Sequence, residues 1–400
     1  RSLSPFLHFL TSLIIFYSVY LLTNSFKKAL LGSFLYLLMP GISFSSFLIS
    51  TDVPLLLFSS LIALCIIKIF NSKKNTFLLF CLLGFFFALG FLSKYAIFYL
   101  LLSFLFSIVI DKECRRFFLN KSFLFSVIVS ITLIFPNLIW NYTNEFVTFS
   151  HTASNANLSH IKINIFKGIT FLLSQIFIFG VIPFLYLSKK TLSLLSFNAI
   201  QKIFLITFIL PIFIVFLLAI FSRANANWSV VGYPFACILL PTLLNSKKNF
   251  MNYIFIFNQL TFSTMIIISI FFLPIFNLDP FANIKHIKPL SSIIKNEITN
   301  RNNIALMTDD REDYAQLLYY LKNLDIKKAK WNGDLKIDDH YELTTDHNDL
   351  KGYDVLLITR TRPTPNMESK ATATEKVNSF NFKTNKRQKN FNLYILKNWK

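Results

Sequence analysis

Isolated charged residues between long apolar runs are the first candidates for chemistry in this sequence. Asp52 has no other charged residue near it in sequence, and Pro54 follows it at the start of an apolar run. A carboxylate at the edge of hydrocarbon is costly unless it faces protein or water, so Asp52 is a functional candidate. Alternatively, Asp52 only caps the helix that Pro54 begins by accepting backbone N–H bonds.

Two cations have similar positions. Lys94 follows the apolar run Phe85–Leu92, and hydrophobicity returns at once with Tyr95. It is either an interfacial lysine whose ammonium reaches the water or a cation that binds a lipid-linked phosphate. The near absence of a loop holds Lys94 close to the membrane plane and favours phosphate binding. Arg223 suits bidentate phosphate recognition.

Polar and aromatic residues accompany these charges. Asn227 follows Arg223 closely and can bond sugar hydroxyls, while Trp228 either stacks on a sugar face or belongs to the interfacial aromatic belt. Trp140 and Asn141 open a long polar segment that runs to Lys167 and includes four residues of interest, Glu145, Phe149, His151 and His160.

This long segment offers little support for a metal site. His151 and His160 are nine residues apart and lack a third ligand nearby, so a divalent metal is only a weakly supported option. Glu145 and His151 can contact a substrate instead. No other cofactor is indicated.

Composition separates the chain into two parts. Residues 1–277 carry 19 Lys/Arg and 4 Asp/Glu, whereas residues 278–400 carry 21 and 16. With 54% hydrophobic residues in the whole chain, the first part is expected to be a polytopic helical membrane domain. The second is expected to be a water-soluble α/β domain. The net charge of +20 is explained by loop lysines that set topology and contact lipid, and no basic stretch suits nucleic acid.

Ten apolar runs are expected to form spanning helices. They are Pro5–Asn24, Ala29–Ser50, Pro54–Phe70, Thr76–Ser93, Tyr95–Ile110, Ser122–Trp140, Gly168–Leu187, Ile203–Phe221, Val230–Leu244 and Phe250–Phe276. Every second connection holds basic residues, 14 of the 19 before residue 278. By the positive-inside rule these connections face the cytoplasm, which puts Asp52, Lys94 and Arg223 on the outer face, together with residues 278–400.

Elements of the second part follow from its pattern. Strands are expected at Asn303–Met307, Tyr353–Thr359 and Asn392–Leu396, and a helix at Asp310–Leu321 with Asp309 or Asp310 as N-cap. The Thr/Pro/Lys-rich segment Arg360–Val377 is expected to be a mobile loop. Cys65, Cys81, Cys114 and Cys237 form no C-x-x-C pair and indicate no disulfide framework.

Four motifs in order resemble a known family. They are Thr51–Phe58, Leu89–Tyr95, Pro136–Asn141 and Ala226–Trp228. They resemble the bacterial branch of the dolichyl-phosphate-mannose protein mannosyltransferases, which includes the lipid A aminoarabinose transferases. The resemblance implies a GT-C membrane glycosyltransferase that passes a sugar from a polyprenyl-phosphate donor to an acceptor outside the cytoplasmic membrane. The acceptor would be lipid A, a cell-surface glycan or a protein.

The same resemblance assigns roles. In this family an acidic pair in the first outer loop is credited with catalysis, and this chain is expected to begin just after that loop. Asp52 would then be a supporting carboxylate, with Lys94 and Arg223 on the donor phosphate. Asn227, Trp228, Trp140, Asn141, Glu145 and His151 would contact sugar or acceptor. The alternatives are a transporter of lipid-linked glycans and an inactive remnant of the transferase.

Overall fold

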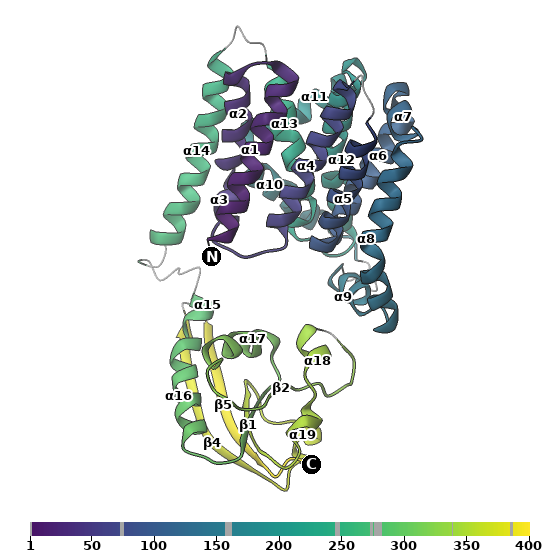
Figure 1. Cartoon of the computed structure of the whole chain (residues 1–400). Helices are drawn as coiled ribbons and strands as arrows, with labels where there is room; N and C mark the ends of the chain where they lie inside the picture. Colours follow the sequence, from purple (N-terminus) through teal and green to yellow (C-terminus); the bar gives the residue numbers. More distant parts are fainter. Residues whose placement is uncertain are drawn as a thin grey trace. The chain divides into compact units, whose positions relative to one another are not determined.

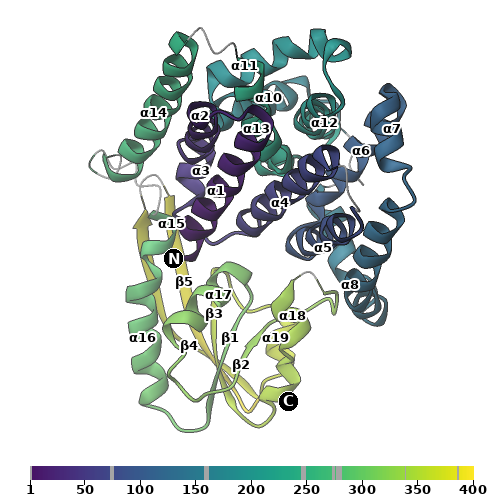
Figure 2. The same cartoon turned by 45° about the horizontal axis from the view of Figure 1, so that its top comes forward.

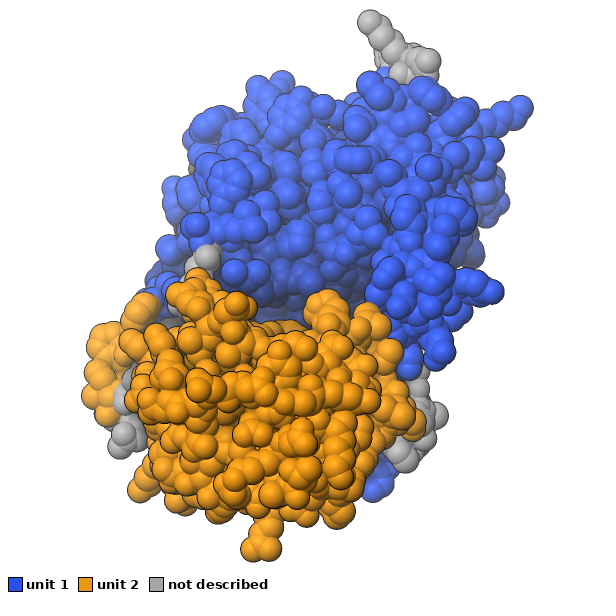
Figure 3. Space-filling model, turned by 60° about the horizontal axis from the view of Figure 1, so that its bottom comes forward, with its two compact units in different colours: residues 1–269 blue, residues 270–400 orange. Residues whose placement is uncertain are grey.

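The structure is a computed structural model that describes residues 2–72, 76–156, 162–244, 249–272, 275, 282–337, 339–384 and 387–400. It divides into two compact units, unit 1 (residues 1–269) and unit 2 (residues 270–400), which are coloured separately in Figure 3. The domain boundary predicted between residues 277 and 278 lies outside the described residues and stays a prediction.

Unit 1 is a bundle of apolar helices (Figure 1), because a helix satisfies its own backbone polar groups in hydrocarbon. The helices are α1 (Leu3–Thr23), α2 (Phe26–Leu37), α3 (Pro40–Ser45), α4 (Asp52–Asn71), α5 (Phe77–Ser93), η1 (Tyr95–Ile97), α6 (Phe98–Ile110), α7 (Lys112–Phe118), α8 (Phe123–Thr143), α9 (Val147–Ala156), α10 (Ile165–Phe179), α11 (Val181–Lys190), η2 (Thr191–Ser196), α12 (Ala199–Phe221), η3 (Ala226–Gly232), α13 (Tyr233–Leu243) and α14 (Asn249–Phe272).

The polytopic helical class is confirmed. Within the described residues, 6 helices are long and apolar enough to cross a membrane, or up to 7 if a bent pair counts as one span. Two further apolar helices, Phe77–Ser93 and Tyr95–Ile110, are shorter. The number of ten spans stays a prediction.

Two of the expected continuous helices are broken. The run Ala29–Ser50 divides into α2 and α3 because Pro40, at the first turn of α3, lacks the N–H that would continue the ladder. The run Gly168–Leu187 bends by 110° between α10 and α11. Gly180 makes this bend with a φ of 105°, which favours glycine because a side chain is strained there.

The expectation of a long loop from Trp140 to Lys167 is wrong for much of its length. Helix α8 continues to Thr143, and Val147–Ala156 form α9. The turn between them places Glu145 and Phe146 at positive φ. The polar side chains of this segment are therefore held mainly on helices.

Two hydrogen bonds show which residues lie at each end of the bundle. The Ser4 hydroxyl donates to the Leu48 carbonyl, so α1 begins near the start of α4. The 21 residues of α1 then carry the chain ~30 Å to the opposite end, since an α-helix rises 1.5 Å per residue. At that end the Lys28 ammonium donates to the Leu244 carbonyl. Asp52 and Lys28 therefore belong to opposite ends of the bundle.

Helix α4 occupies the middle of a row of helices (Figure 2). It packs against α1 on one side and α5 on the other, and α5 packs in turn against α8. Gly84 of α5 permits the last contact, since a Cβ there would lie 2.2 Å from the Ser126 carbonyl oxygen of α8. Ser130 of α8 also donates a hydrogen bond of 2.9 Å to the Gly84 carbonyl.

Unit 2 is built on a mixed five-stranded sheet with the order β2-β1-β3-β5-β4. Strands β1, β2 and β3 are parallel, whereas β5 is antiparallel to both β3 and β4. The elements are α15 (Ala282–Lys285), α16 (Ile287–Thr299), β1 (Ile304–Thr308), α17 (Arg311–Tyr320), β2 (Lys328–Lys330), α18 (His340–Thr344), η5 (His347–Leu350), β3 (Asp354–Thr359), α19 (Pro365–Ser369), β4 (Ala373–Thr384) and β5 (Arg387–Lys397).

Alternating side chains of this sheet enter two hydrophobic cores. Leu306 belongs to the core that holds residues of α16 and α17, while its neighbour Met307 belongs to the core around Trp331 and Trp399. A strand alternates its side chains between faces, so one apolar strand serves both cores. The predicted α/β class of this unit is confirmed.

The strands expected from the apolar runs are present, and Asp310 is the N-cap of α17, with its side chain accepting from Glu312 and Asp313. The mobile loop expected at Arg360–Val377 is wrong. This segment contains α19 and enters β4, which pairs along its length with β5. Pairing with β5, the next strand along the chain, overrides the weak strand preference of this polar sequence.

Candidate functional site

Asp52 is the first residue of α4, and its carboxylate bonds to two distant side chains. The Lys94 ammonium lies 2.5 Å from Asp52 Oδ1, and Asn227 Nδ2 donates to Asp52 Oδ2 at 2.7 Å. The residue before Asp52 is the N-cap and makes no side-chain cap bond. The interpretation of Asp52 as only a helix cap is therefore wrong, because both of its oxygens face other elements.

Lys94 reaches this carboxylate because α5 ends immediately before it. Its backbone is extended, with φ −164° and ψ 134°, and its N–H still donates to the Gly90 carbonyl. Helix η1 begins at the next residue. Because the backbone is extended between the two apolar helices, the Lys94 side chain reaches Asp52 of α4. The Lys94 side chain is 21% exposed.

Asn227 comes from a third element, the short helix η3. Helix α12 ends at Phe221, and Asn225 in an extended conformation precedes η3. Asp52 thus joins residues 42 and 175 positions away in sequence. We call these three residues the Asp52–Lys94–Asn227 cluster.

Arg223 lies on the connection that leads to η3. It is exposed and has no hydrogen bond or ion pair within the described part of the chain. Two lysines lie beside the same connection, because the Lys162 N–H donates to the Phe221 carbonyl and the Lys167 ammonium donates to the Ser222 carbonyl. The nearness of these lysines to Arg223 was not predicted, since it depends on pairing between distant segments.

Trp228 follows Asn227 on η3 and is half-buried against the core of unit 1. Trp140 is 40% exposed near the end of α8. The exposure of these two rings does not test whether they bind a sugar, so sugar binding by Trp228 and Trp140 stays a prediction.

Asn141 is fully buried and bonded within its own region. Its amide nitrogen donates to the Asn137 carbonyl, and its oxygen accepts from the Thr148 hydroxyl. The Thr148 hydroxyl also bonds to the Tyr95 hydroxyl at 2.8 Å. Through Tyr95, which follows Lys94, Asn141 is connected with the Asp52–Lys94–Asn227 cluster.

Glu145 and His151 are not brought to the cluster by any contact among described residues. Glu145 is exposed in the turn between α8 and α9, and the His151 ring bonds to Asn155 one helical turn away. His160 lies outside the described residues. Their predicted contacts with substrate stay predictions.

Gln175 of α10 is a residue that sequence reasoning missed. It is fully buried and bonds to three residues of η3 and α13, namely Ala226, Ser229 and Tyr233. Gln175 could have been identified from the sequence, because it is the single side-chain amide within the apolar run Gly168–Leu187 and an unpaired polar group there is costly.

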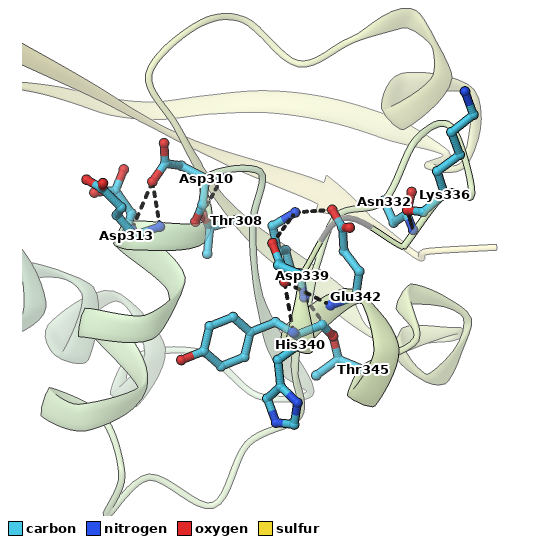
Figure 4. Close-up of polar contacts among 12 residues, drawn as sticks. Thr308, Asp310, Asp313, Asn332, Lys336, Asp339, His340, Glu342 and Thr345 are labelled. Carbon is cyan, nitrogen blue, oxygen red and sulfur yellow. Dashed lines mark hydrogen bonds and ion pairs between the residues drawn. The ribbon is translucent and has the colours of Figure 1, made fainter. Parts of the chain in front are cut away.

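The carboxyl ends of the parallel strands in unit 2 carry a second polar cluster (Figure 4). Arg360 makes a bidentate pair with Asp313, with two N–O distances of 2.9 Å. The Lys330 ammonium pairs with Asp339 and Glu342, both visible in Figure 4. Asp309 accepts from the Thr359 hydroxyl, and burial raises the pKa of its carboxyl. These charges are satisfied by one another, which suits stabilisation of the fold.

A metal site is not assembled by the described residues, in which no group of three or more His, Cys, Asp or Glu side chains is arranged to hold an ion. The divalent metal considered for His151 and His160 stays an untested possibility because one of the two histidines is not described.

Two comparisons with known proteins bear on this site. Residues 4–140 match the family model described as dolichyl-phosphate-mannose-protein mannosyltransferase. The chain resembles the GT-C glycosyltransferases. Over 250 residues it is also 25% identical to the lipid A galacturonosyltransferase RgtD of Rhizobium johnstonii. No solved structure gives a significant match.

The family match lies within the helical unit 1. The alignment spans 62% of this chain and 52% of the relative, so the chain spans about half the length of the curated relative it matches. Asp52 and Lys94 both fall within the family match, and Asn227 lies beyond it. The resemblance predicted from the four motifs is confirmed.

Proposed function

We propose that this protein is a membrane glycosyltransferase that moves a sugar from a polyprenyl-phosphate donor to an acceptor at the outer face of the cytoplasmic membrane. The observation that carries the proposal is the Asp52–Lys94–Asn227 cluster, which gathers a carboxylate, a cation and an amide from α4, the end of α5 and η3. The family match adds support, because that family is described as a mannosyltransferase that uses dolichyl phosphate mannose, a lipid-phosphate sugar.

The reaction is a displacement with inversion at the anomeric carbon. The acceptor hydroxyl oxygen forms a bond to that carbon, its proton passes to a base, and the bond to the phosphate oxygen breaks. Polyprenyl phosphate leaves with the bonding electrons, so its phosphate gains negative charge in the transition state. A cation held at this phosphate lowers the barrier.

Lys94 is the cation that we assign to the donor phosphate. An ammonium has three N–H donors, and the bond to Asp52 uses one, which leaves two for phosphate oxygens. Asp52 accepts from Lys94 on one oxygen and from Asn227 on the other, so we assign it the role of orienting these two side chains. Arg223 adds a second cation on the connection to η3.

The acceptor is assigned from the relative that the chain resembles. That protein is a lipid A galacturonosyltransferase, so lipid A is the first acceptor to test, with other cell-envelope glycans and proteins after it. A lipid acceptor lies in the same leaflet as a polyprenyl donor, which suits a site at one end of the helix bundle. The sugar is to be identified with a panel of polyprenyl-phosphate sugars.

The test measures sugar transfer by the full-length protein in lipid vesicles. Lys94→Ala is expected to lower the transfer rate ~100-fold, the usual order for loss of one donor that stabilises transition-state charge. Lys94→Arg is expected to recover part of the loss.

The matched control is Lys202→Ala. Lys202 forms an ion pair of the same 2.5 Å length with Asp111, at the end of α6 and away from the cluster. Equal losses in the Lys94 and Lys202 variants would contradict the assignment of Lys94.

A transporter of lipid-linked glycans is the second candidate function. The 110° break between α10 and α11 favours it, because transporters use broken helices at their substrate sites. Only this one bent pair is found in the described residues, whereas inverted repeats would supply two. Movement of a labelled donor across vesicles without sugar transfer would support the transporter.

A further inference from the structure

The buried amide of Gln175 connects α10 with the element that carries Asn227. Gln175 is fully buried on α10. Its nitrogen donates to the Ala226 carbonyl at 2.8 Å and to the Ser174 hydroxyl at 3.3 Å. Its oxygen accepts from the hydroxyls of Ser229 at 2.8 Å and Tyr233 at 2.5 Å.

These four bonds use the full capacity of the side chain. A primary amide has two N–H donors and an oxygen with two acceptor positions, and each of them has a partner here. The orientation of the amide is determined by Ala226, because a backbone carbonyl can only accept and therefore faces the nitrogen. In an apolar bundle such a satisfied amide specifies one arrangement of its partners.

Two hydrogen-bond partners of Gln175 lie on either side of Asn227 in the sequence. Ala226 comes immediately before Asn227, and Ser229 follows two positions later. Packing then leaves η3 little freedom, since a Cβ on Gly232 would lie 2.3 Å from the Thr207 carbonyl of α12. Tyr233 packs against Phe179 of α10, with ring centroids 5.1 Å apart. Gln175 thus sets where η3 presents its exposed side chains.

We propose that Gln175 is a positioning residue that holds Asn227 against Asp52, and this inference rests on the proposed function of the Asp52–Lys94–Asn227 cluster. Among the described residues, no hydrogen bond joins Gln175 to the cluster itself. It acts through η3, and the hydrogen bond of 2.7 Å between Asn227 and Asp52 is the feature that it maintains. This bond in turn leaves Asp52 Oδ1 directed at Lys94.

A double-mutant cycle on the transfer rate tests the proposal. Gln175→Met keeps the length of the side chain and removes its hydrogen bonds. It is expected to lower the transfer rate about tenfold when Asn227 is present and less than about twofold in the Asn227→Ala background. Such coupling is expected because Gln175 acts through Asn227.

Gln259→Met is the matched control. Gln259 of α14 is a second fully buried glutamine, and its nitrogen donates to the Phe179 and Leu35 carbonyls rather than to η3. Its loss disturbs the same bundle without touching Asn227, so its effect is expected to be the same with and without Asn227. A cycle in which Gln175 and Asn227 are additive, like Gln259 and Asn227, would overturn the proposal.

The same cycle on thermal unfolding does not depend on any activity. Asn227→Ala is expected to lower the unfolding midpoint, and in the Gln175→Met background to lower it by less than about half as much. If the wild-type protein transfers no sugar while this coupling is present, the proposed function fails and the positioning role stands. If transfer is measured but both cycles are additive, the positioning role fails and the proposed function stands.

Discussion

At the scale of single residues, neighbouring groups decide what each charge can do. The two carboxylate oxygens of Asp52 accept hydrogen bonds from Lys94 and Asn227, whereas the Lys330 ammonium in unit 2 pairs with two carboxylates. Removing one partner of a buried pair leaves the other charge without compensation, which usually costs more than the pair contributes. Lys94 differs from Lys330 in keeping more of its side chain exposed, 21% against 7%.

His286 in unit 2 predicts a dependence of stability on pH. Both of its ring nitrogens are buried without a hydrogen-bond partner among the described residues, and its ring stacks on Phe391. Burial, helped by the charges of Lys389 and Arg360, lowers the pKa of His286 from 6.5 to about 4. The unfolded chain therefore binds more protons between these values, and stability is lost as the pH falls from about 6.5 towards 4.

The size of this effect follows from the shift of the His286 pKa and is at most about 3–4 kcal/mol, at about 1.4 kcal/mol per pKa unit. His286→Phe keeps an aromatic ring beside Phe391 and cannot be protonated. The thermal midpoint of unit 2 is expected to fall less between pH 7 and pH 5 in this variant than in the wild type. Equal falls in the two proteins would show that other groups carry the pH dependence.

At the scale of elements, close helix contacts and helix interruptions position the site. Helix α5 ends at Ser93, and this end lets the Lys94 side chain reach Asp52 of α4. Helix α10, which carries Gln175, ends at Phe179 with Gly180 as its C-cap. The contact of α5 with α8 has little tolerance for added volume, because Gly84 meets backbone atoms of Ser126 rather than a movable side chain.

Gly84→Leu is expected to destabilise unit 1 by ~2 kcal/mol or more. The added side chain would separate α5 from α8 and strain the hydrogen bond between Ser130 and the Gly84 carbonyl, and overpacking typically costs about 1–3 kcal/mol. The measurement is thermal unfolding in detergent. Ile131→Ala on the exposed side of α8 is the control and is expected to have little effect. A Gly84→Leu protein as stable as this control would contradict the close contact.

At the scale of the whole molecule, the two ends of unit 1 carry different charged groups. One end carries Lys28 and the Lys202–Asp111 pair, and the other carries the Asp52–Lys94–Asn227 cluster. The positive-inside rule assigns the lysine-rich end to the cytoplasm. This orientation is part of the proposed function, since polyprenyl-linked sugars would then be used at the outer face.

Labelling of single cysteines checks the orientation. Asn225→Cys is expected to react with a membrane-impermeant maleimide in intact cells, and Lys27→Cys only after the cells are opened, because the two exposed positions belong to opposite ends. Peptide mass spectrometry separates these sites from the four native cysteines. The reverse pattern would place the cluster in the cytoplasm and contradict the outer-face site.

Local properties of the sequence determined the class of this protein. Long apolar runs can only be satisfied as helices in lipid, short apolar runs such as β1 and β3 form buried strands, and an Asp beside the first turn of α17 caps it. The isolated charges Asp52 and Lys94 were identifiable for the same reason, since a charge between apolar runs requires a partner.

Only the tertiary structure decided which partners meet. The bond between Asp52 and Asn227 joins residues 175 positions apart, and the sequence around either residue does not indicate its partner. The hydrogen bond of Gln175 to the Ala226 carbonyl of η3 arises in the same way, since these residues are 51 positions apart. Short-range patterns express backbone and solvation preferences, whereas packing between distant segments depends on the shape of the whole bundle.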